Sequence, residues 1–376
     1  MSKIDCDFPG GNIIVENING DEVILKPDLR DTQGHWFYWY FRTQNAKGRK
    51  LKFRFNTNGC IIGAKGPAVS LNKGKTWSWF DAIDDKSFES DFKEDVDDVR
   101  FSVGMPYLQE HLNSFLLKYK DNKHLKLGTL CETRKGRDVE MLHVGCIAYE
   151  PKIRVAMTAR HHACEMMANY TQEGIIEGIL DNDKIGRWFC DNVEFLIIPF
   201  VDKDGVEDGD QGKSRIPYDH NRDYFDMSIY ETVIALKKYA SSWHKGNLRF
   251  FLDMHCPYLV GGRNLELFFV STPDEKMWAK VGQFSEILER VQKGTLIFNP
   301  KNNLPYGLEW NVGSEGKTSS SWFANIVNDG ISISIEIPYA IAGGSIVNQT
   351  TANEFGHDLI VALYKYLRKS MSSFQF

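Results

Sequence analysis

Two adjacent histidines and a glutamate are the first residues in this chain whose types and spacing suggest chemistry. His161, His162 and Glu165 lie in the segment TARHHACEMMANY, directly after the short apolar run 153–157. A histidine and a glutamate spaced as His-x-x-Glu can converge on a metal ion from one turn of the chain. The motif is short and arises often by chance, so a solvated loop with polar side chains is the alternative.

Two further residues of the same kind follow or end other strand-like runs. His255 comes after the run 250–253, and Glu336 lies in the β-branched run ISISIEIPY. A lone buried carboxylate is costly unless it is paired or its pKa is raised. A catalytic zinc commonly takes three protein ligands and leaves one position for water. His162, Glu165 and His255 fit that requirement, whereas His161 fits less well because adjacent residues tend to point apart.

The runs that carry these residues alternate in type along the chain. Strand-like runs cover 139–148, 153–158, 193–200, 249–254 and 331–337, and helix-like runs cover 164–181, 227–241, 275–292 and 353–369. Such alternation predicts an α/β sheet with helices packed on it. Ligands of these sheets collect at the carboxyl ends of the strands, which is where the candidate residues lie.

The first part of the chain has a different rhythm. Residues 1–80 contain short β-branched and aromatic runs separated by Asn-Gly and Lys-Gly turn signals. We therefore predict an antiparallel β-sandwich domain over 1–105 and an α/β domain over 106–376. The aromatic run HWFYWYF (35–41) is expected in the sandwich core and domain interface rather than in a stacking platform. The acidic segment 81–100 lacks an EF-hand pattern and is expected to be a solvated loop or strand edge.

Composition excludes several classes of protein. The chain has 376 residues, of which 42% are hydrophobic and 25% charged, as is typical of a soluble globular protein. Its net charge of −5 argues against a general affinity for nucleic acid or an anionic membrane. Seven cysteines without a CxxC pair do not suggest a disulfide framework. The N-terminus has no signal-peptide run and the chain has no membrane span, so we expect a cytoplasmic protein of undetermined oligomeric state.

Four motifs together resemble a known family. The segments ARHHACE, DHNR, LDMHC and ISIEIPY occur in the order, and at about the separations, found in the zinc carboxypeptidase family of carboxypeptidase A. With a β-sandwich in front, the chain resembles the cytosolic carboxypeptidase branch. The resemblance covers residues 107–376 by motif. It implies a mixed central sheet with helices on both faces, preceded by the antiparallel sandwich.

The resemblance also implies a role for each matching residue. His162, Glu165 and His255 would bind one zinc ion per chain, and Glu336 would act as general base and acid. Asn221 and Arg222 of DHNR match the pair that holds the terminal carboxylate of the substrate. An arginine offers a bidentate fork that matches a carboxylate, so a free C-terminus can be recognised. The implied activity is hydrolysis of the C-terminal peptide bond of peptides or protein tails.

Two departures from the family pattern affect the oxyanion site and the closing loop. Gly212 stands where the family keeps an arginine that stabilises the oxyanion, and Lys213 and Arg215 lie close by. Either could serve as the cationic donor, or could pair with an acidic substrate side chain. The segment GSEGKTSSSWF has no equivalent of the family's mobile tyrosine.

Other interpretations remain open from the sequence. A zinc amidohydrolase of the aspartoacylase type, acting on small N-acyl amino acids, shares the zinc motif and an Asn-Arg pair but lacks the sandwich. A non-catalytic binding module would require an essential residue to be missing. Arg222 could simply form a surface ion pair, and His220 is expected to shape its loop. Cys164 and Cys256 lie beside proposed ligands, but the ligand set is complete without thiolates.

Overall fold

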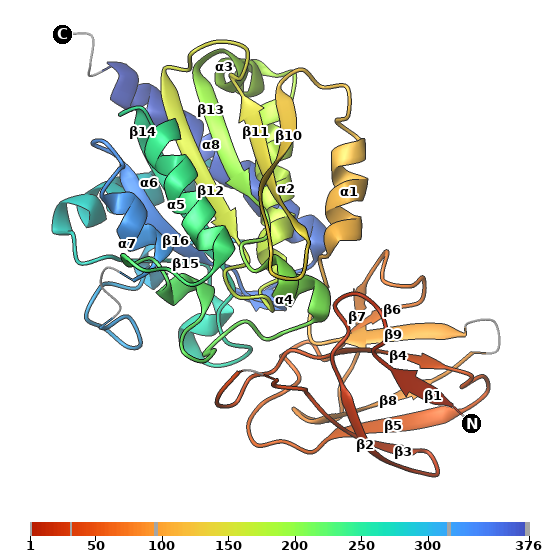
Figure 1. Ribbon diagram of the computed structural model, residues 1–376. Coiled ribbons are helices and arrows are strands. Elements are labelled where there is room, and N and C mark those ends of the chain that lie inside the picture. Colours follow the sequence, from red (N-terminus) through yellow and green to blue (C-terminus); the bar gives the residue numbers. More distant parts are fainter. Residues whose placement is uncertain (1, 31, 94–96, 314–316, 373–376) are drawn as a thin grey trace.

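The N-terminal strands form two facing sheets in the computed structural model, which describes residues 2–30, 32–93, 97–313 and 317–372 (Figure 1). The first sheet is antiparallel throughout and has the order β1 (Lys3–Asp5), β4 (Tyr40–Gln44), β9 (Asp98–Ser102), β6 (Ala68–Ser70), β7 (Ser78–Trp79). The second has the order β2 (Ile14–Asn19), β3 (Glu22–Lys26), β5 (Lys50–Phe55), β8 (Ser87–Asp91).

One pair in the second sheet departs from the predicted antiparallel sandwich. Strands β3 and β5 are parallel, because the chain between them crosses to the other sheet as β4 before it returns. The segment 81–100, predicted to be a loop or strand edge, contains β8, which is an edge strand of its sheet, and the start of β9; its residues 94–96 lie outside the described part.

Aromatic side chains fill the space between the two sheets. Strand β5 alternates between exposed and buried residues, and its Phe53 packs against Phe88 and Phe101 with ring centroids 4.9 and 5.5 Å apart. Trp39 and Phe41, from the run 35–41, are buried in the same cluster. Large aromatic rings contribute most of the buried apolar area in such a core, which explains why this region is so rich in them.

The rest of the chain builds a mixed seven-stranded sheet, as predicted. Its order is β10 (Leu125–Glu132), β11 (Asp138–Gly145), β13 (Val193–Ile198), β12 (Ile153–Ala159), β14 (Leu248–His255), β16 (Ile331–Glu336), β15 (Phe268–Val270). The four central strands β13, β12, β14 and β16 are parallel, and the remaining pairs are antiparallel. A small hairpin is formed by β17 (Ile341–Ala342) and β18 (Ser345–Ile346).

Helices cover both faces of this sheet (Figure 1). One face packs on α2 (Met167–Leu180), α3 (Lys184–Asn192), α6 (Glu275–Val291) and α8 (Gln349–Ser372). The other packs on α5 (Glu231–Trp243) and α7 (Ser319–Ala324). The connections carry α1 (Gln109–Leu117), α4 (Lys203–Asp208), η1 (His220–Arg222), η2 (Gly262–Leu265) and η3 (Pro300–Asn302). Neighbouring residues of β12 enter different apolar clusters, Val155 on one face and Ala156 on the other, as a strand buried on both sides requires.

The sheets of the two regions lie on either side of residue 105, where the sequence predicts a domain boundary. That boundary, with domains 1–105 and 106–376, stays a prediction. Among the helices of the described residues, none combines the length and apolar character that crossing a membrane would require.

Helices α2 and α8 approach closely because glycines face the contact. A Cβ at Gly174 would lie 2.0 Å from the carbonyl oxygen of Asn353, and one at Gly356 would lie 2.1 Å from that of Thr171. By contrast, a Cβ at Gly282 of α6 would meet no atom within 4 Å. Backbone therefore packs on backbone between α2 and α8, and any side chain there would push the helices apart.

We expect Gly356→Ala to lower the free energy of unfolding by about 1–3 kcal/mol, the usual effect of overpacking. The control Gly282→Ala places the same methyl group in open space and should raise the free energy of unfolding by about 0.5–1 kcal/mol, since alanine favours a helix over glycine. Denaturant unfolding followed by circular dichroism measures both. Equal effects of the two substitutions would show that the helix contact is not tight.

Candidate metal centre

Two histidines and a glutamate converge at the carboxyl ends of β12 and β14. Oε1 of Glu165 lies 3.0 Å from Nδ1 of His162, and its Oε2 lies 2.7 Å from Nδ1 of His255. The ligand atoms of the three residues all lie within 4.8 Å of one another. Two imidazole nitrogens and a carboxylate form a donor set that suits zinc. The residues present therefore fit the ion that the sequence suggested.

A buried arginine holds the loop that carries His162 and Glu165. Arg160 follows β12 with a φ of 62°, which turns the chain sharply at the end of the strand. Its guanidinium group donates to the carbonyl oxygens of Ala163 (3.0 Å) and Tyr107 (2.9 Å) and to Oδ1 of Asn169 (2.9 Å). These bonds satisfy a charge that would otherwise be costly to bury, and they fix the loop against α2.

Each histidine of the group also faces an aspartate. Nε2 of His255 lies 2.7 Å from Oδ2 of Asp253, and Nε2 of His162 lies 3.5 Å from Oδ1 of Asp219. Burial opposes ionisation, yet the neighbouring histidines hold the pKa of both aspartates below its usual range. Carboxylates behind the imidazoles orient the rings and make them better ligands.

A second group could also hold a metal by distance alone, namely His161, Asp253 and His255. In it, Nδ1 of His161 lies 2.8 Å from Oδ1 of Asp253 and Nε2 lies 2.7 Å from the hydroxyl of Tyr224. Asp253 also accepts hydrogen bonds from Thr158 (2.7 Å). Both ring nitrogens of His161 are thus engaged in the closed interior, so we interpret this group as a hydrogen-bonded support for His255.

Glu336 lies beside the metal group because of the way its strand pairs with the neighbouring strand. It ends β16 and is the parallel-strand partner of His255 on β14. Its side chain is buried, and its Oε2 has no hydrogen-bond partner in the described structure. Burial raises the pKa of Glu336 to about 7, although His255 opposes the shift. His162, His255 and Glu336 line one pocket together.

Asn221 and Arg222 line the same pocket from η1. Asp219 caps this short helix by accepting from the backbone N–H of Asn221 at 3.0 Å. Nδ2 of Asn221 lies 3.1 Å from Nε2 of His255, and Nη1 of Arg222 donates to the carbonyl oxygen of Asn221 at 3.0 Å. His220 points away and stacks on Tyr230 with ring centroids 3.6 Å apart, consistent with its expected role in shaping the loop.

The two candidate oxyanion donors lie in different places. Nζ of Lys213 is 2.6 Å from Oε1 of Glu165, and the Lys213 side chain is 13% exposed. Arg215 instead lies outside the pocket, where its guanidinium group is 2.6 Å from Asp202 and 2.7 Å from Asp210. The structure therefore brings Lys213, but not Arg215, to the metal group.

The two cysteines beside the ligands are buried. Burial raises the pKa of the Cys164 thiol to about 11 and holds that of Cys256 well above its usual range. Both are therefore protonated near neutral pH, which does not favour a thiolate ligand.

Residues 112–247 match the zinc carboxypeptidase family. Cytosolic carboxypeptidase 2 of Mus musculus is 26% identical over 342 residues, and cytosolic carboxypeptidase 6 of Caenorhabditis elegans is 22% identical over 315. These matches cover 78% and 73% of this chain but 38% and 68% of the relatives. A metallo-carboxypeptidase from Burkholderia cenocepacia has the same fold, with a TM-score of 0.80 at 19% identity over 98% of this chain and 99% of that one.

The fold, the converging donor set and these relatives define a hydrolase of the metallopeptidase class. Within that class, the chain is similar to the zinc carboxypeptidase family over residues 112–247 and to a cytosolic carboxypeptidase over most of its length. The resemblance that the four sequence motifs indicated is thereby confirmed, as is the fold that it implied. The family implies a zinc cofactor.

Three residues at the centre were not singled out from the sequence: Arg160, Asp219 and Asp253. Asp219 begins DHNR, and Asp253 precedes His255 by two residues on one strand. Because residues two apart on a strand share a face, the spacing Asp-x-His could have indicated a hydrogen-bonded pair. Arg160 gave no such signal, since an arginine after a strand is normally taken to be solvated.

One substitution in each of the two candidate metal groups can distinguish which of them binds the ion. We expect His162→Ala to lose stoichiometric zinc, because it removes one of the three proposed ligands and that ligand lines the open pocket. His161→Gln should keep one zinc per chain, because its ring serves only as a hydrogen-bond partner. Metal analysis of dialysed, folded protein measures both, and Tyr224→Phe gives a milder probe of the His161 group. Zinc retained in His162→Ala and lost in His161→Gln would assign the ion to the inner group instead.

Proposed function

We propose that this protein is a zinc-dependent metallocarboxypeptidase that hydrolyses the C-terminal peptide bond of peptides or protein tails. The observation that carries the proposal is that three kinds of group line one pocket. They are the two histidines of the metal group, Glu336 with its unpartnered Oε2, and Arg222. A peptidase that acts at a free C-terminus requires these three elements within the length of one residue.

One zinc ion per chain would be held by His162, Glu165 and His255, and when bound it supplies a polarised scissile carbonyl and a water of lowered pKa. Glu336 then serves as the proton carrier. Its free Oε2 accepts a proton from the attacking water and delivers it to the amide nitrogen as the C–N bond breaks. The products are a shortened chain with a new carboxylate and a free amino acid.

Arg222 and Asn221 account for the choice of the C-terminus. The guanidinium group of Arg222 offers paired N–H donors that match a carboxylate, and only the last residue of a peptide carries one beside the scissile bond. The hydrogen bonds of Asn221 to His255 and to the backbone N–H of Ser319 (2.9 Å) fix the platform next to the metal group. Internal peptide bonds offer no such charge and would be ignored.

Lys213 is the proposed oxyanion donor. Its ammonium group lies 2.6 Å from Glu165, a proposed zinc ligand, whereas Arg215 is held by two aspartates elsewhere. Although burial opposes it, Glu165 raises the pKa of Lys213 above its usual range. A permanently charged donor at this place stabilises the negative charge that develops on the carbonyl oxygen.

The pocket wall beyond Arg222 indicates the class of side chain that would be removed. Among the described lining residues, this wall carries hydroxyl and aromatic groups, including Ser271, Ser321, Ser334 and Trp310. Arg222 is the only lysine or arginine in that lining. Because Lys213 and Arg215 are committed to carboxylates of the protein, an acidic side chain would find no cation. We therefore propose a neutral residue at the C-terminus of the substrate.

The amidohydrolase alternative has no support from the relatives above, which are named as carboxypeptidases. The binding-module alternative required a missing essential residue, and every proposed ligand and the base are present at the site. The names of the cytosolic relatives support a cytoplasmic location as part of the same proposal.

Replacement of Glu336 tests the catalytic role directly. We expect Glu336→Gln to lower kcat by about 10²–10⁴-fold, the usual contribution of a general base, while zinc content stays at one per chain. Release of amino acid from N-blocked dipeptides measures the rate. Glu289→Gln changes an exposed glutamate in the same way and should match the parent protein. Unchanged release by Glu336→Gln would contradict the mechanism.

Substrate choice follows from the uncharged wall. Blocked dipeptides that end in Ser, Thr or Phe should be cleaved with a kcat/KM at least about tenfold higher than those that end in Glu, since an unpaired buried charge costs more than 1.4 kcal/mol. Ser321→Lys adds a cation to the wall and should reverse the ranking toward Glu. A parent protein that prefers Glu would overturn the assignment without affecting the metal site.

A further inference from the structure

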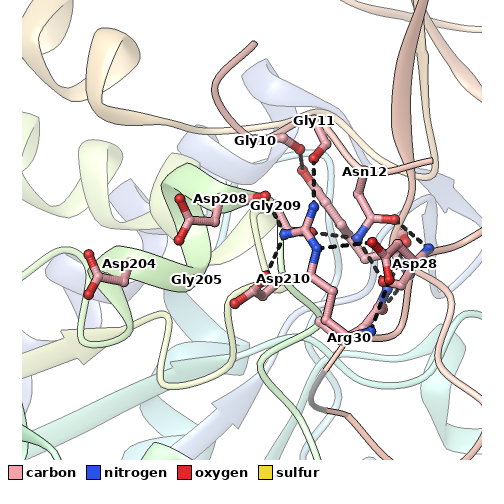
Figure 2. Close-up of polar contacts among 12 residues, drawn as sticks. Gly10, Gly11, Asn12, Asp28, Arg30, Asp204, Gly205, Asp208, Gly209 and Asp210 are labelled. Carbon is pink, nitrogen blue, oxygen red and sulfur yellow. Dashed lines mark hydrogen bonds and ion pairs between the residues drawn. The ribbon is translucent and has the colours of Figure 1, made fainter. Parts of the chain in front are cut away.

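The N-terminal sheet region (the part of the chain before residue 105) forms hydrogen bonds with the loop after α4, which leads to the metal centre. Nδ2 of Asn12 donates to the carbonyl oxygen of Gly209 at 2.7 Å (Figure 2). Arg30 reaches across with one nitrogen 2.5 Å from both the carbonyl oxygen of Asp208 and Oδ1 of Asp210. Figure 2 shows these side chains of the N-terminal region converging on the loop after α4. The loop is therefore held from outside its own sheet.

The next residue of that loop is paired more completely. Gln211 is buried, and its side-chain amide accepts from the backbone N–H of Tyr38 at 2.7 Å and donates to the carbonyl oxygen of Tyr38 at 2.8 Å. Three residues further on, the carbonyl oxygen of Ser214 accepts from the backbone N–H of Gln33 at 3.1 Å. The Gln211 amide thus takes the place of a strand neighbour for the aromatic run 35–41.

Between Gln211 and Ser214, the backbone of a glycine packs directly against the loop that carries His162 and Glu165. Gly212 has a φ of 74°, and a Cβ there would lie 2.1 Å from the backbone nitrogen of Ala163. No side chain fits at this position. Lys213, which comes next, turns inward and places its ammonium group on Glu165.

An aromatic residue of the N-terminal region lies over that ammonium group. Nζ of Lys213 is 5.2 Å from the centroid of the Trp36 ring, within the range of a cation–π contact. The Trp36 ring also packs against Tyr258, three residues beyond the ligand His255, with centroids 6.4 Å apart. Lys213 therefore stands between a carboxylate of the catalytic sheet region and an indole of the N-terminal region.

We propose that the N-terminal sheet region is a working part of the active site and that Gln211 and Trp36 position the Lys213 ammonium group. Gln211 fixes the backbone from which Lys213 departs, and Trp36 fixes the direction of its side chain. The inference rests on the proposed function, since it takes Lys213 to be the oxyanion donor. Neither Gln211 nor Trp36 would touch the reacting atoms.

Four variants of the full-length, zinc-loaded protein test the proposal: Gln211→Ala, Trp36→Leu, Trp36→Phe and Lys213→Ala. Lys213→Ala should lower kcat about 10²–10³-fold, as loss of an oxyanion donor does. Trp36→Leu should lower kcat about tenfold with little change in KM, because a cation–π contact is lost. Trp36→Phe keeps an aromatic face and should recover most of that loss. Trp77→Leu, a half-buried tryptophan elsewhere in the same region, is the control.

A second readout does not depend on activity. The rate at which Lys213 is acetylated by an amine-reactive ester, followed by mass spectrometry, should rise severalfold in Gln211→Ala and in Trp36→Leu. The other lysines should react at unchanged rates, and zinc content should remain one per chain. Because Trp36 is only half-buried, its variants serve if Gln211→Ala does not fold.

The outcomes separate the two proposals. If Lys213→Ala keeps the parent kcat, the oxyanion role of Lys213 is wrong. If Lys213→Ala loses activity while Gln211→Ala and Trp36→Leu keep both the parent kcat and the parent acetylation rate, the positioning role is overturned and the carboxypeptidase stands. In a Lys213→Ala background, Trp36→Leu should cause no further loss of kcat, and an additional tenfold loss would also overturn it.

Discussion

The carboxylate of Glu165 is fully buried, and an ionised carboxylate in such a place is stable only when cations and donors surround it. His162, His255 and Lys213 do so at 3.0, 2.7 and 2.6 Å. Burial opposes ionisation, but these neighbours hold the pKa of Glu165 well below its usual range. His162, His255 and Lys213 come from three different parts of the fold. The burial of one charged side chain therefore depends on the correct placement of several distant elements.

The parallel strands meet two of those requirements. Because β12 and β14 run side by side, the loop after one and the last residue of the other reach the same edge of the sheet. Strands β14 and β16 are also parallel neighbours, and their pairing alone places Glu336 next to His255. Lys213 is different, since it comes from a loop that depends on Arg30, Gln211 and the aromatic run of the N-terminal sheets.

The sequence predicted the fold, and the candidate residues that it named lie together, but it did not predict how strands and loops connect them. The alternation of strands and helices indicated the sheet, and the polar residues after the apolar runs indicated its active edge. The parallel pairing of β3 and β5 was not foreseen, because alternating burial looks the same in both strand directions. Nor could the sequence separate Lys213 from Arg215, since both lie in one polar loop. Only the fold shows that Lys213 pairs with Glu165, whereas Arg215 pairs with Asp202 and Asp210.

The tight passage at Gly212 has a consequence for how this protein can change. The sequence resemblance places Gly212 where the family keeps an arginine, and the backbone here leaves no room for even a methyl group. Restoring the arginine would require the loop to take another path, which would remove Lys213 from Glu165 and release the contacts with the N-terminal sheets. The proposed lysine donor and the contacts with the N-terminal sheets therefore depend on the same short segment, 209–214, so a side chain at position 212 would disturb both.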